Sequence, residues 1–216
     1  MDTTFWFQRW KENEIGFHQG EANPLLVKYF NALSLVNDSR VFLPLCGKTL
    51  DIAWLVSRGY RVVGAELSEM AIKQLFNELG LKPSISVEGA FNRYSANKIE
   101  IFVGDIFNLS SELLGPVDAV YDRAALIALP EIMRQRYTAH LSFITNNAPQ
   151  LLLCYEYDQS LMEGPPFSLS NEELRQHYNE RYQLTLLTTI HVPEKLKGQC
   201  EAVEHAWLLK SNKTPS

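Results

Sequence analysis

Short apolar runs rich in β-branched and aromatic residues alternate along most of the chain with segments that have the apolar periodicity of helices. From residue 40 onward the pattern predicts seven strands, over residues 40–45, 61–66, 99–103, 117–121, 150–157, 183–190 and 202–209. Helices are predicted between the first three strands, over 49–58 before Gly59 and over 69–79 before Gly80. This alternation is typical of an α/β fold with a mostly parallel sheet.

Two segments fall outside the alternation. The stretch SISVEGAFNRYSANKIEIFVGD alternates like a hairpin, with Glu88-Gly89 as its expected turn, before the third main strand begins. The first 32 residues indicate an aromatic-rich helix, a loop, and a second helix opened by Asn23-Pro24, because proline suits the first turn of a helix. No linker or repeat divides the sequence, so we expect one domain over residues 1–210 and a loose tail over 211–216.

Composition narrows the classes of protein. The 216 residues are 46% hydrophobic and 21% charged, with a net charge of −5 and no basic run, so neither nucleic acid nor a membrane is expected as a partner. The start, MDTTFWFQRWKENE, lacks the basic and apolar parts of a signal peptide, and no apolar run reaches membrane-spanning length, which predicts a cytoplasmic protein. Cys46, Cys154 and Cys200 are far apart and form no C-x-x-C pair, which indicates buried thiols rather than disulfides or a metal site.

The stretch LPLCGKTLD follows the first predicted strand with Gly47-Lys48-Thr49, as a phosphate-binding loop would. That loop needs a second glycine five positions before Gly47, because its backbone N–H groups curl around the phosphates. Phe42 holds this position inside the strand. A nucleoside triphosphatase is therefore disfavoured, and a strand, a short glycine turn and a helix remain.

Candidate binding residues follow the predicted strands, and ligands of open α/β sheets bind beyond the carboxyl ends of the strands. Gly47 after the first strand allows close approach of backbone to a ligand, and Glu66 at the end of the second, about 20 residues later, suits a ribose. Asp105-Ile106 after the third offer a polar and an apolar group to an adenine, and Asp122-Arg123 follow the fourth. In this order the groups predict a nucleoside ligand.

Each of these residues also has a structural interpretation. A lone glycine after a strand is most often a turn, Glu66 could be an acid at a helix N-terminus, and Asp122 could form an ion pair with Arg123. A dinucleotide would need G-x-G-x-x-G to seat its pyrophosphate, whereas LCGKTLD has one glycine. A nucleoside without phosphates, of which S-adenosylmethionine is the common one, fits this loop better.

Six stretches that span nearly the whole chain in order are distinctive: FWFQRWKENEIGFHQGEANPLL, PLCGKTLDIAWL, GYRVVGAELSE, VGDIFNL, YDRAALIALP and YEYDQSLMEGPPFSL. They resemble the thiopurine S-methyltransferase family, and its bacterial members in particular. The resemblance implies a Rossmann-like class I S-adenosylmethionine-dependent methyltransferase. Such a fold has a seven-stranded, mostly parallel sheet with helices on both faces, and here an N-terminal helical lid over residues 1–32.

The resemblance also implies how S-adenosylmethionine, which leaves as S-adenosylhomocysteine, would be held. Leu45 and Gly47 would line its methionine part, and Glu66 would hold its ribose. Asp105 and Ile106 would flank its adenine.

Aromatic residues of the lid have family counterparts as well. Trp6 and Trp10 match a pair that closes over the cofactor, and their i, i+4 spacing puts both rings on one helix face. Core packing is the plain alternative for such a pair, and a cation–π contact with the sulfonium is a second use. Phe17 matches an aromatic residue beside the substrate, whereas the neighbouring His18 is expected to be structural.

On the acceptor side, Arg123 matches the family arginine near the acceptor and is also expected to touch the cofactor. Mammalian members carry a second arginine before the last strand, where this chain has HVPEKLKGQCEA. Lys195, or alternatively Lys197, would take its place as a point charge without the planar fork of arginine.

The implied reaction is in-line methyl transfer to aromatic or heterocyclic thiols such as thiopurines. Arg123 would favour the thiolate, while Asp122 would orient Arg123 or, as a weaker candidate, accept a proton. Selenium or tellurium species, oxygen or nitrogen acceptors, and a cofactor-binding module without turnover stay open as alternatives. We expect a monomer whose partner is a small-molecule acceptor.

Overall fold

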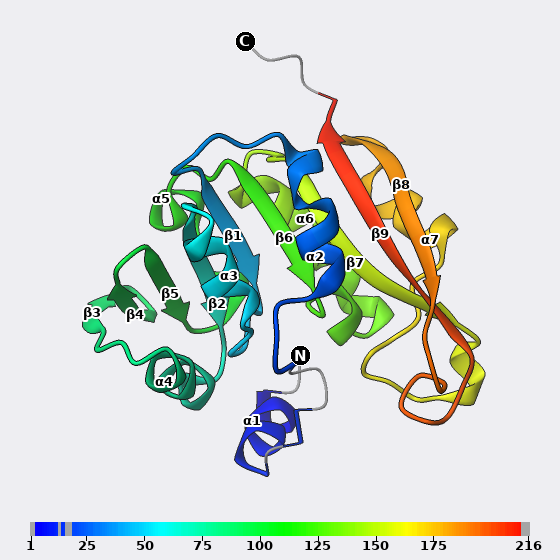
Figure 1. Ribbon diagram of the computed structural model, residues 1–216, viewed down its shortest axis with the longest axis horizontal. Coiled ribbons are helices and arrows are strands. Elements are labelled where there is room, and N and C mark those ends of the chain that lie inside the picture. Colours follow the sequence, from blue (N-terminus) through cyan, green and yellow to red (C-terminus); the bar gives the residue numbers. More distant parts are fainter. Residues whose placement is uncertain (1–2, 13, 16–18, 213–216) are drawn as a thin grey trace.

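A computed structural model describes residues 3–12, 14–15 and 19–212 of the chain. Its described residues form one mixed sheet of nine strands in the order β3-β4-β5-β2-β1-β6-β7-β9-β8 (Figure 1). The strands are β1 (Arg40–Pro44), β2 (Arg61–Glu66), β3 (Ser84–Glu88), β4 (Phe91–Ala96), β5 (Ile99–Val103), β6 (Ala119–Arg123), β7 (Gln150–Tyr157), β8 (Tyr182–His191) and β9 (Ala202–Ser211).

The predicted α/β fold is confirmed, and so is each of the seven predicted strands. Strands β5, β2, β1, β6 and β7 are parallel, and β9 and β8 extend the sheet in antiparallel fashion beyond β7. The strand count of seven is too low. The expected hairpin forms β3 and β4, and β4 pairs with β5, so its two strands join the sheet at the other edge.

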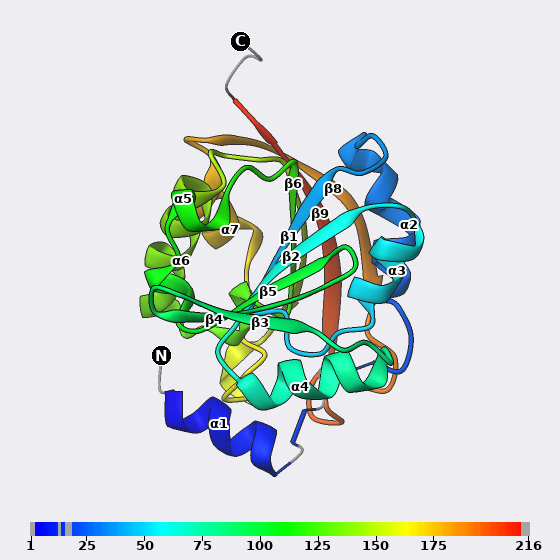
Figure 2. The same cartoon turned by 90° about the vertical axis from the view of Figure 1, so that its left-hand side faces the viewer.

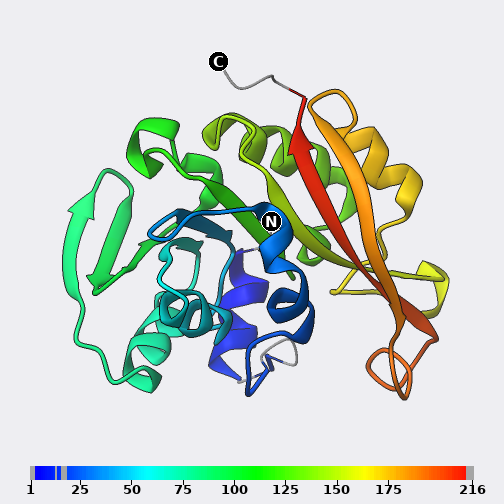
Figure 3. The same ribbon diagram turned by 45° about the horizontal axis from the view of Figure 1, so that its top comes forward.

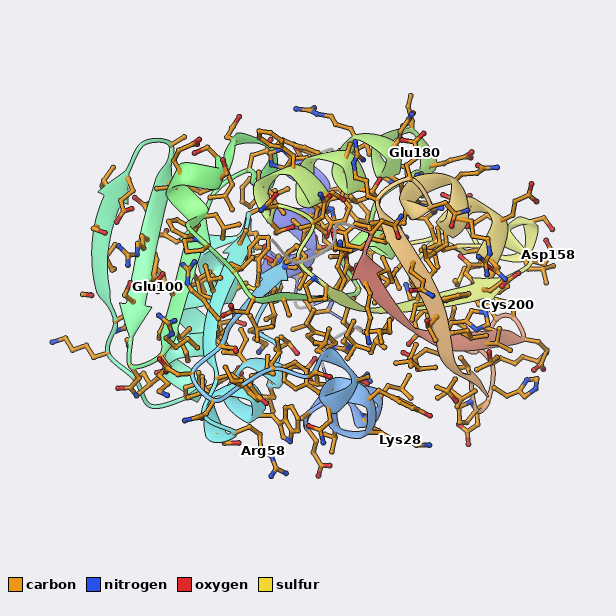
Figure 4. The ribbon with its side chains drawn as sticks, turned by 90° about the horizontal axis from the view of Figure 1, so that it is seen from above. Lys28, Arg58, Glu100, Asp158, Glu180 and Cys200 are labelled. Carbon is orange, nitrogen blue, oxygen red and sulfur yellow. The ribbon has the colours of Figure 1, made fainter. Side chains whose placement is uncertain are left out.

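Side-chain ion pairs attach this hairpin to the parallel strands. Oε1 of Glu100 on β5 lies 2.8 Å from Nη2 of Arg93 on β4. Its Oε2 lies 2.8 Å from Nη2 of Arg40 on β1. Figure 4 shows Glu100 on the hairpin side of the molecule, far from Asp158 and Cys200.

Helices cover both faces of the sheet, as Figures 2 and 3 show. One apolar layer joins the sheet to α2 (Pro24–Tyr29), the 3-10 helix η1 (Phe30–Leu33), α3 (Asp51–Ser57) and α4 (Glu69–Glu78). The other joins it to α5 (Ser111–Leu114), α6 (Glu131–Ile144) and α7 (Asn171–Tyr178). Helix α1 (Thr3–Lys11) and the 3-10 turns η2 (Ile106–Asn108), η3 (Leu126–Ala128) and η4 (Gln159–Leu161) complete the described elements.

Local sequence signals set several helix ends. The Asn23 side chain caps α2 by accepting hydrogen bonds from the N–H groups of Leu25 and Leu26, and Pro24 opens the helix as predicted. Gly59 and Gly80 follow α3 and α4 with φ of +94° and +64°, a backbone conformation that favours glycine. At the other end of the chain, β9 continues to Ser211, one residue into the segment expected as a tail.

Candidate active site

A cavity of about 590 Å³ lies at the carboxyl ends of β1, β2 and β6. Figure 1 shows α1 below the arrowheads of these central strands. The lining residues come from α1, the β1–α3 turn, the strands β2, β6 and β7, the start of β9, and the loops that precede α7 and β9. They include Trp6, Arg9, Trp10, Leu45, Cys46, Gly47, Lys48, Asp51, Glu66, Tyr121, Arg123, Tyr155, Pro165, Pro166, Lys197 and Glu204.

Glu66 organises one end of this cavity. Its Oε2 accepts a hydrogen bond from the Gly47 N–H at 2.8 Å, and its Oε1 accepts one from the Ser68 N–H at 2.8 Å. Leu45 and Gly47 have φ of +45° and +54°, so the chain curls after β1 and presents this N–H to the carboxylate. Burial raises the pKa of Glu66, and the backbone donors partly offset this rise. The turns after β1 and β2 are therefore fixed to each other by one buried carboxylate.

Helix α1 closes a second side of the cavity. Trp6 and Trp10 both line it, as their spacing on one helix face predicts. Trp10 is 4% exposed and packs in one apolar cluster with Ile15 and with Ala71 of α4, so packing and cavity lining occur together. Phe17 and His18, also expected in the lid, lie outside the described residues.

Arg123, the last residue of β6, lines the cavity and has a buried partner. Nη1 of Arg123 lies 3.7 Å from Oδ2 of Asp51, which is 1% exposed. Asp51 also accepts hydrogen bonds from the Asn23 N–H at 2.7 Å and the Tyr121 hydroxyl at 3.0 Å. Asp51 was not among the residues predicted from sequence, although its place in the first turn of α3, shortly after the glycine turn, was a usable signal.

Asp122 does not line this cavity. It is fully buried, and its carboxylate accepts hydrogen bonds from the Tyr137 hydroxyl at 2.7 Å and the Leu126 N–H at 3.1 Å. Burial raises its pKa to about 6. The predicted strand end at Tyr121 was wrong, because β6 runs to Arg123 and neighbouring strand residues point to opposite faces. The expected pairing of Asp122 with Arg123 is thus replaced by the Asp51–Arg123 pair.

The two residues expected at the adenine lie beside the cavity rather than in its lining. Asp105 is exposed and caps η2 by accepting a hydrogen bond from the Phe107 N–H at 3.0 Å, and Ile106 is buried. The preceding Gly104 donates its N–H to the Glu66 carbonyl at 2.8 Å, which places this turn next to the Glu66 end. Their part in adenine binding stays a prediction.

Of the two lysines considered for the acceptor side, Lys197 lines the cavity and Lys195 does not. Lys195 is exposed, with φ of +66°. Lys197 donates a hydrogen bond from Nζ to the Pro165 carbonyl at 2.6 Å, and burial lowers its pKa. The structure therefore favours the alternative lysine over the one first named.

Glu204 and Tyr155 are further lining residues that the sequence analysis missed. They are direct cross-strand partners on β9 and β7. Burial raises the pKa of Glu204, whereas Arg123 and hydrogen bonding from the Tyr155 phenol lower it. Two carboxylates, Asp51 and Glu204, thus accompany the Arg123 guanidinium in the lining.

The described residues contain no group of three or more His, Cys, Asp or Glu side chains placed to hold a metal ion. Cys46, Cys154 and Cys200 are buried free thiols, as expected. Across the described part of the chain, no helix has both the length and the apolar character needed to cross a membrane.

A family model described as thiopurine S-methyltransferase matches residues 1–212. The chain belongs to this family. A thiopurine S-methyltransferase of Xanthobacter autotrophicus is 56% identical over 97% of this chain and 99% of its own length. One of Teredinibacter turnerae is 49% identical over 98% and 99%. The resemblance inferred from the six stretches is confirmed.

Solved structures share the fold at low identity. A 1,6-didemethyltoxoflavin-N1-methyltransferase of Burkholderia thailandensis, with bound 1,6-didemethyltoxoflavin and S-adenosylhomocysteine, superposes with a TM-score of 0.65 at 14% identity, covering 96% of this chain and 87% of its own. An S-adenosylmethionine-dependent methyltransferase of Anabaena variabilis gives 0.64 at 12% identity, covering 97% and 95%. These likenesses confirm the Rossmann-like class I architecture.

As a member of the family, the protein is an S-adenosylmethionine-dependent methyltransferase. The residues of the cavity fit this cofactor. The glycine turn has no side chain at Gly47, Glu66 offers carboxylate oxygens for hydroxyl groups, and Trp6 and Trp10 offer aromatic faces for a cation.

Proposed function

We propose that the protein methylates the sulfur of small aromatic or heterocyclic thiols, including thiopurines. The observation that carries the proposal is that Glu66, Arg123, Trp6 and Trp10 line one and the same cavity. One end suits a nucleoside and the other a small acceptor with anionic character. The distance between reacting groups is then set by the rigid ends of β1, β2 and β6.

For the cofactor, we assign the ribose hydroxyls to Glu66 and the methionine part to the turn that contains Leu45 and Gly47. When bound, S-adenosylmethionine supplies an electrophilic methyl group on a sulfonium. Trp6 and Trp10, which line the cavity, would shield that group from water and supply aromatic rings for its charge. The adenine is assigned to Asp105 and Ile106, whose turn lies beside Glu66 because the Gly104 N–H donates to the Glu66 carbonyl.

For the acceptor, we assign Arg123 the role of holding the sulfur as an anion. Its partner Asp51 is tied to the Asn23 N–H and the Tyr121 hydroxyl, so the guanidinium is oriented by a fixed carboxylate. Lys197, which also lines the cavity, is assigned the place of the arginine of mammalian members. Orientation of sulfur and methyl in line at about 3–3.5 Å supplies several kcal/mol of the barrier reduction.

The test is methyl transfer from labelled S-adenosylmethionine to a mercaptopurine, beside selenite and a phenol as other acceptors. Arg123→Ala should lower thiol turnover by roughly 100-fold, the range for loss of a charged group that acts in the transition state. Arg58→Ala is the matched control, because Arg58 is exposed at the periphery of α3 (Figure 4) and outside the cavity. Binding of S-adenosylmethionine without any thiol turnover would overturn the thiol proposal and leave the other acceptors.

Turnover of a selenium or tellurium species, or of an oxygen or nitrogen acceptor, in place of the thiol is the alternative result of this assay. The cytoplasmic location and the monomeric state stay predictions from the sequence.

A further inference from the structure

Glu204 lies where a proton acceptor for the methyl acceptor would be needed. It is the third residue of β9 and lines the cavity beside Arg123. Its cross-strand partner is Tyr155 on β7, which also lines the cavity, and its partner on the other side is the apolar Ile190 of β8. A carboxylate is thus exposed to the same space as the guanidinium that we assign to the acceptor sulfur.

The other carboxylates near Arg123 are less suited to accept a proton from a ligand. Asp51 is 1% exposed and is occupied by the Asn23 N–H, the Tyr121 hydroxyl and Arg123. Asp122 points to the opposite face of the sheet, toward Tyr137. Glu204 is half-buried and faces a phenol and the open cavity.

The groups around Glu204 set how easily it takes up a proton. Burial is the largest cause and raises its pKa, while Arg123 on β6 and Tyr155 on β7 lower it. The charge of Glu204 in turn helps to raise the pKa of Tyr121 on β6 and that of Cys154 on β7. Three further cations line the same cavity: Arg9 of α1, Lys48 of the turn after β1, and Lys197 of the loop before β9.

We propose that Glu204 is the general base of the reaction, and that it takes the proton from acceptors that arrive as neutral thiols. This inference rests on the proposed thiol methylation. The S–H bond breaks and its proton moves to a carboxylate oxygen of Glu204. The electron pair left on sulfur forms the new bond to the methyl carbon, and the carbon–sulfonium bond breaks with its electrons to leave a neutral thioether.

Charge balance favours this arrangement. With Asp51 and Glu204 ionised beside Arg123, these three side chains sum to one negative charge. Transfer of the proton from a neutral thiol to Glu204 leaves that total unchanged and puts the negative charge on sulfur, next to Arg123. A neutral thiol therefore needs Glu204 to become the thiolate, whereas a thiol that is already ionised in solution does not.

The kinetic test compares Glu204→Gln with two acceptors, one aryl thiol with a pKa about two units below the assay pH and one thiol with a pKa about two units above it. General base catalysis predicts a loss of roughly 100-fold in kcat/KM for the protonated thiol and little change for the ionised one. The remaining activity of Glu204→Gln on the thiol of higher pKa should rise about tenfold per pH unit, because in this variant only the fraction already ionised in solution still reacts. Glu204→Asp should recover part of the activity.

Glu156→Gln is the matched control, since Glu156 lies next to Tyr155 on β7 but contacts His205 at 3.1 Å and is absent from the cavity lining. Equal losses on both thiols would make Glu204 a positioning residue and overturn the proposal, as would no loss on either. If the unaltered protein turns over neither thiol, the proposed function fails instead.

A measurement without turnover applies to the unaltered protein and does not depend on the folding of a variant. An aryl thiol that is protonated in solution is added to the complex with S-adenosylhomocysteine, and its thiolate absorbance is recorded. Calorimetry in buffers of different ionisation enthalpy then counts protons released. A thiolate band with no proton released supports transfer to Glu204. A thiolate band with one proton released, or no thiolate band, contradicts it.

Discussion

Replacing Glu66 with glutamine tests how the cofactor end of the cavity is built. The carboxylate uses both oxygens, one for the Gly47 N–H and one for the Ser68 N–H, each at 2.8 Å. Glutamine keeps one acceptor oxygen and puts an NH₂ group where the other was. One buried backbone N–H then faces a donor, and the link between the two turns is broken.

The expected size of the effect has two parts. A hydrogen bond to a charged group is worth about 1.5–3 kcal/mol, and an unpaired buried donor costs about 1–3 kcal/mol. Against this, burial raises the pKa of Glu66, so the ionised carboxylate itself destabilises the fold, and the neutral glutamine removes that cost. We expect a net loss of about 1–2 kcal/mol in the free energy of unfolding.

Ligand binding should suffer more than folding, because the ribose also loses its carboxylate. A further loss of about 1.5–3 kcal/mol corresponds to a Kd for S-adenosylhomocysteine that is roughly 10- to 100-fold weaker. Urea unfolding and titration calorimetry measure the two parts. Glu69→Gln is the control, because Glu69 binds Lys73 and Tyr94 on α4 and β4 without lining the cavity. Unchanged affinity in a folded Glu66→Gln protein would refute the assignment of the ribose to Glu66.

Two other buried charges give predictions for stability. Burial raises the pKa of Asp122 to about 6, so the wild-type fold loses stability as Asp122 ionises with rising pH. The free energy of unfolding of Asp122→Asn, relative to that of the wild type, should therefore rise by about 1–1.5 kcal/mol between about pH 5 and 8. Equal pH dependence of urea unfolding in both proteins would contradict this. Arg134→Ala should cost about 3–5 kcal/mol, because its guanidinium, 3% exposed, binds both oxygens of Glu173 at 2.6 and 2.8 Å and the Ser168 carbonyl at 3.0 Å. Replacement of the exposed Arg175 with alanine is the control. A loss below about 1 kcal/mol in Arg134→Ala would show that the contacts of Arg134 with Glu173 and Ser168 contribute little to stability.

The apolar pattern was sufficient for the order of the strands and helices, because each element carries its own periodicity. It misplaced the end of β6, where Asp122 and Arg123 look like the start of a loop. Both are in the strand, and what makes a buried aspartate acceptable there is the hydroxyl of Tyr137, which is 15 residues further along the chain. Such a partner cannot be read from local sequence.

The cofactor end was predictable for the same local reason. Gly47 follows β1 and Glu66 ends the adjacent β2, one helix joins the two strands, and the contact at 2.8 Å links positions only 19 apart in sequence. The rule that ligands bind at the carboxyl ends of parallel strands places both of them at once. Their family counterparts added roles, and the geometry of the turn is consistent with those roles.

The residues that we assign to the acceptor could not be predicted by this rule, because most of them do not lie at the carboxyl ends of parallel strands. Strand β9 runs antiparallel to β7, so the beginning of β9 lies beside the carboxyl end of β7. Glu204 therefore reaches the cavity from the amino end of its strand, and a rule that considers only the carboxyl ends of strands does not predict it. Asp51 arrives from a helix and Lys197 from a loop. A site assembled in this way can vary its acceptor while β1 and β2 keep the cofactor turn unchanged, which is why the acceptor chemistry must be tested at Glu204 and Arg123 rather than at Glu66.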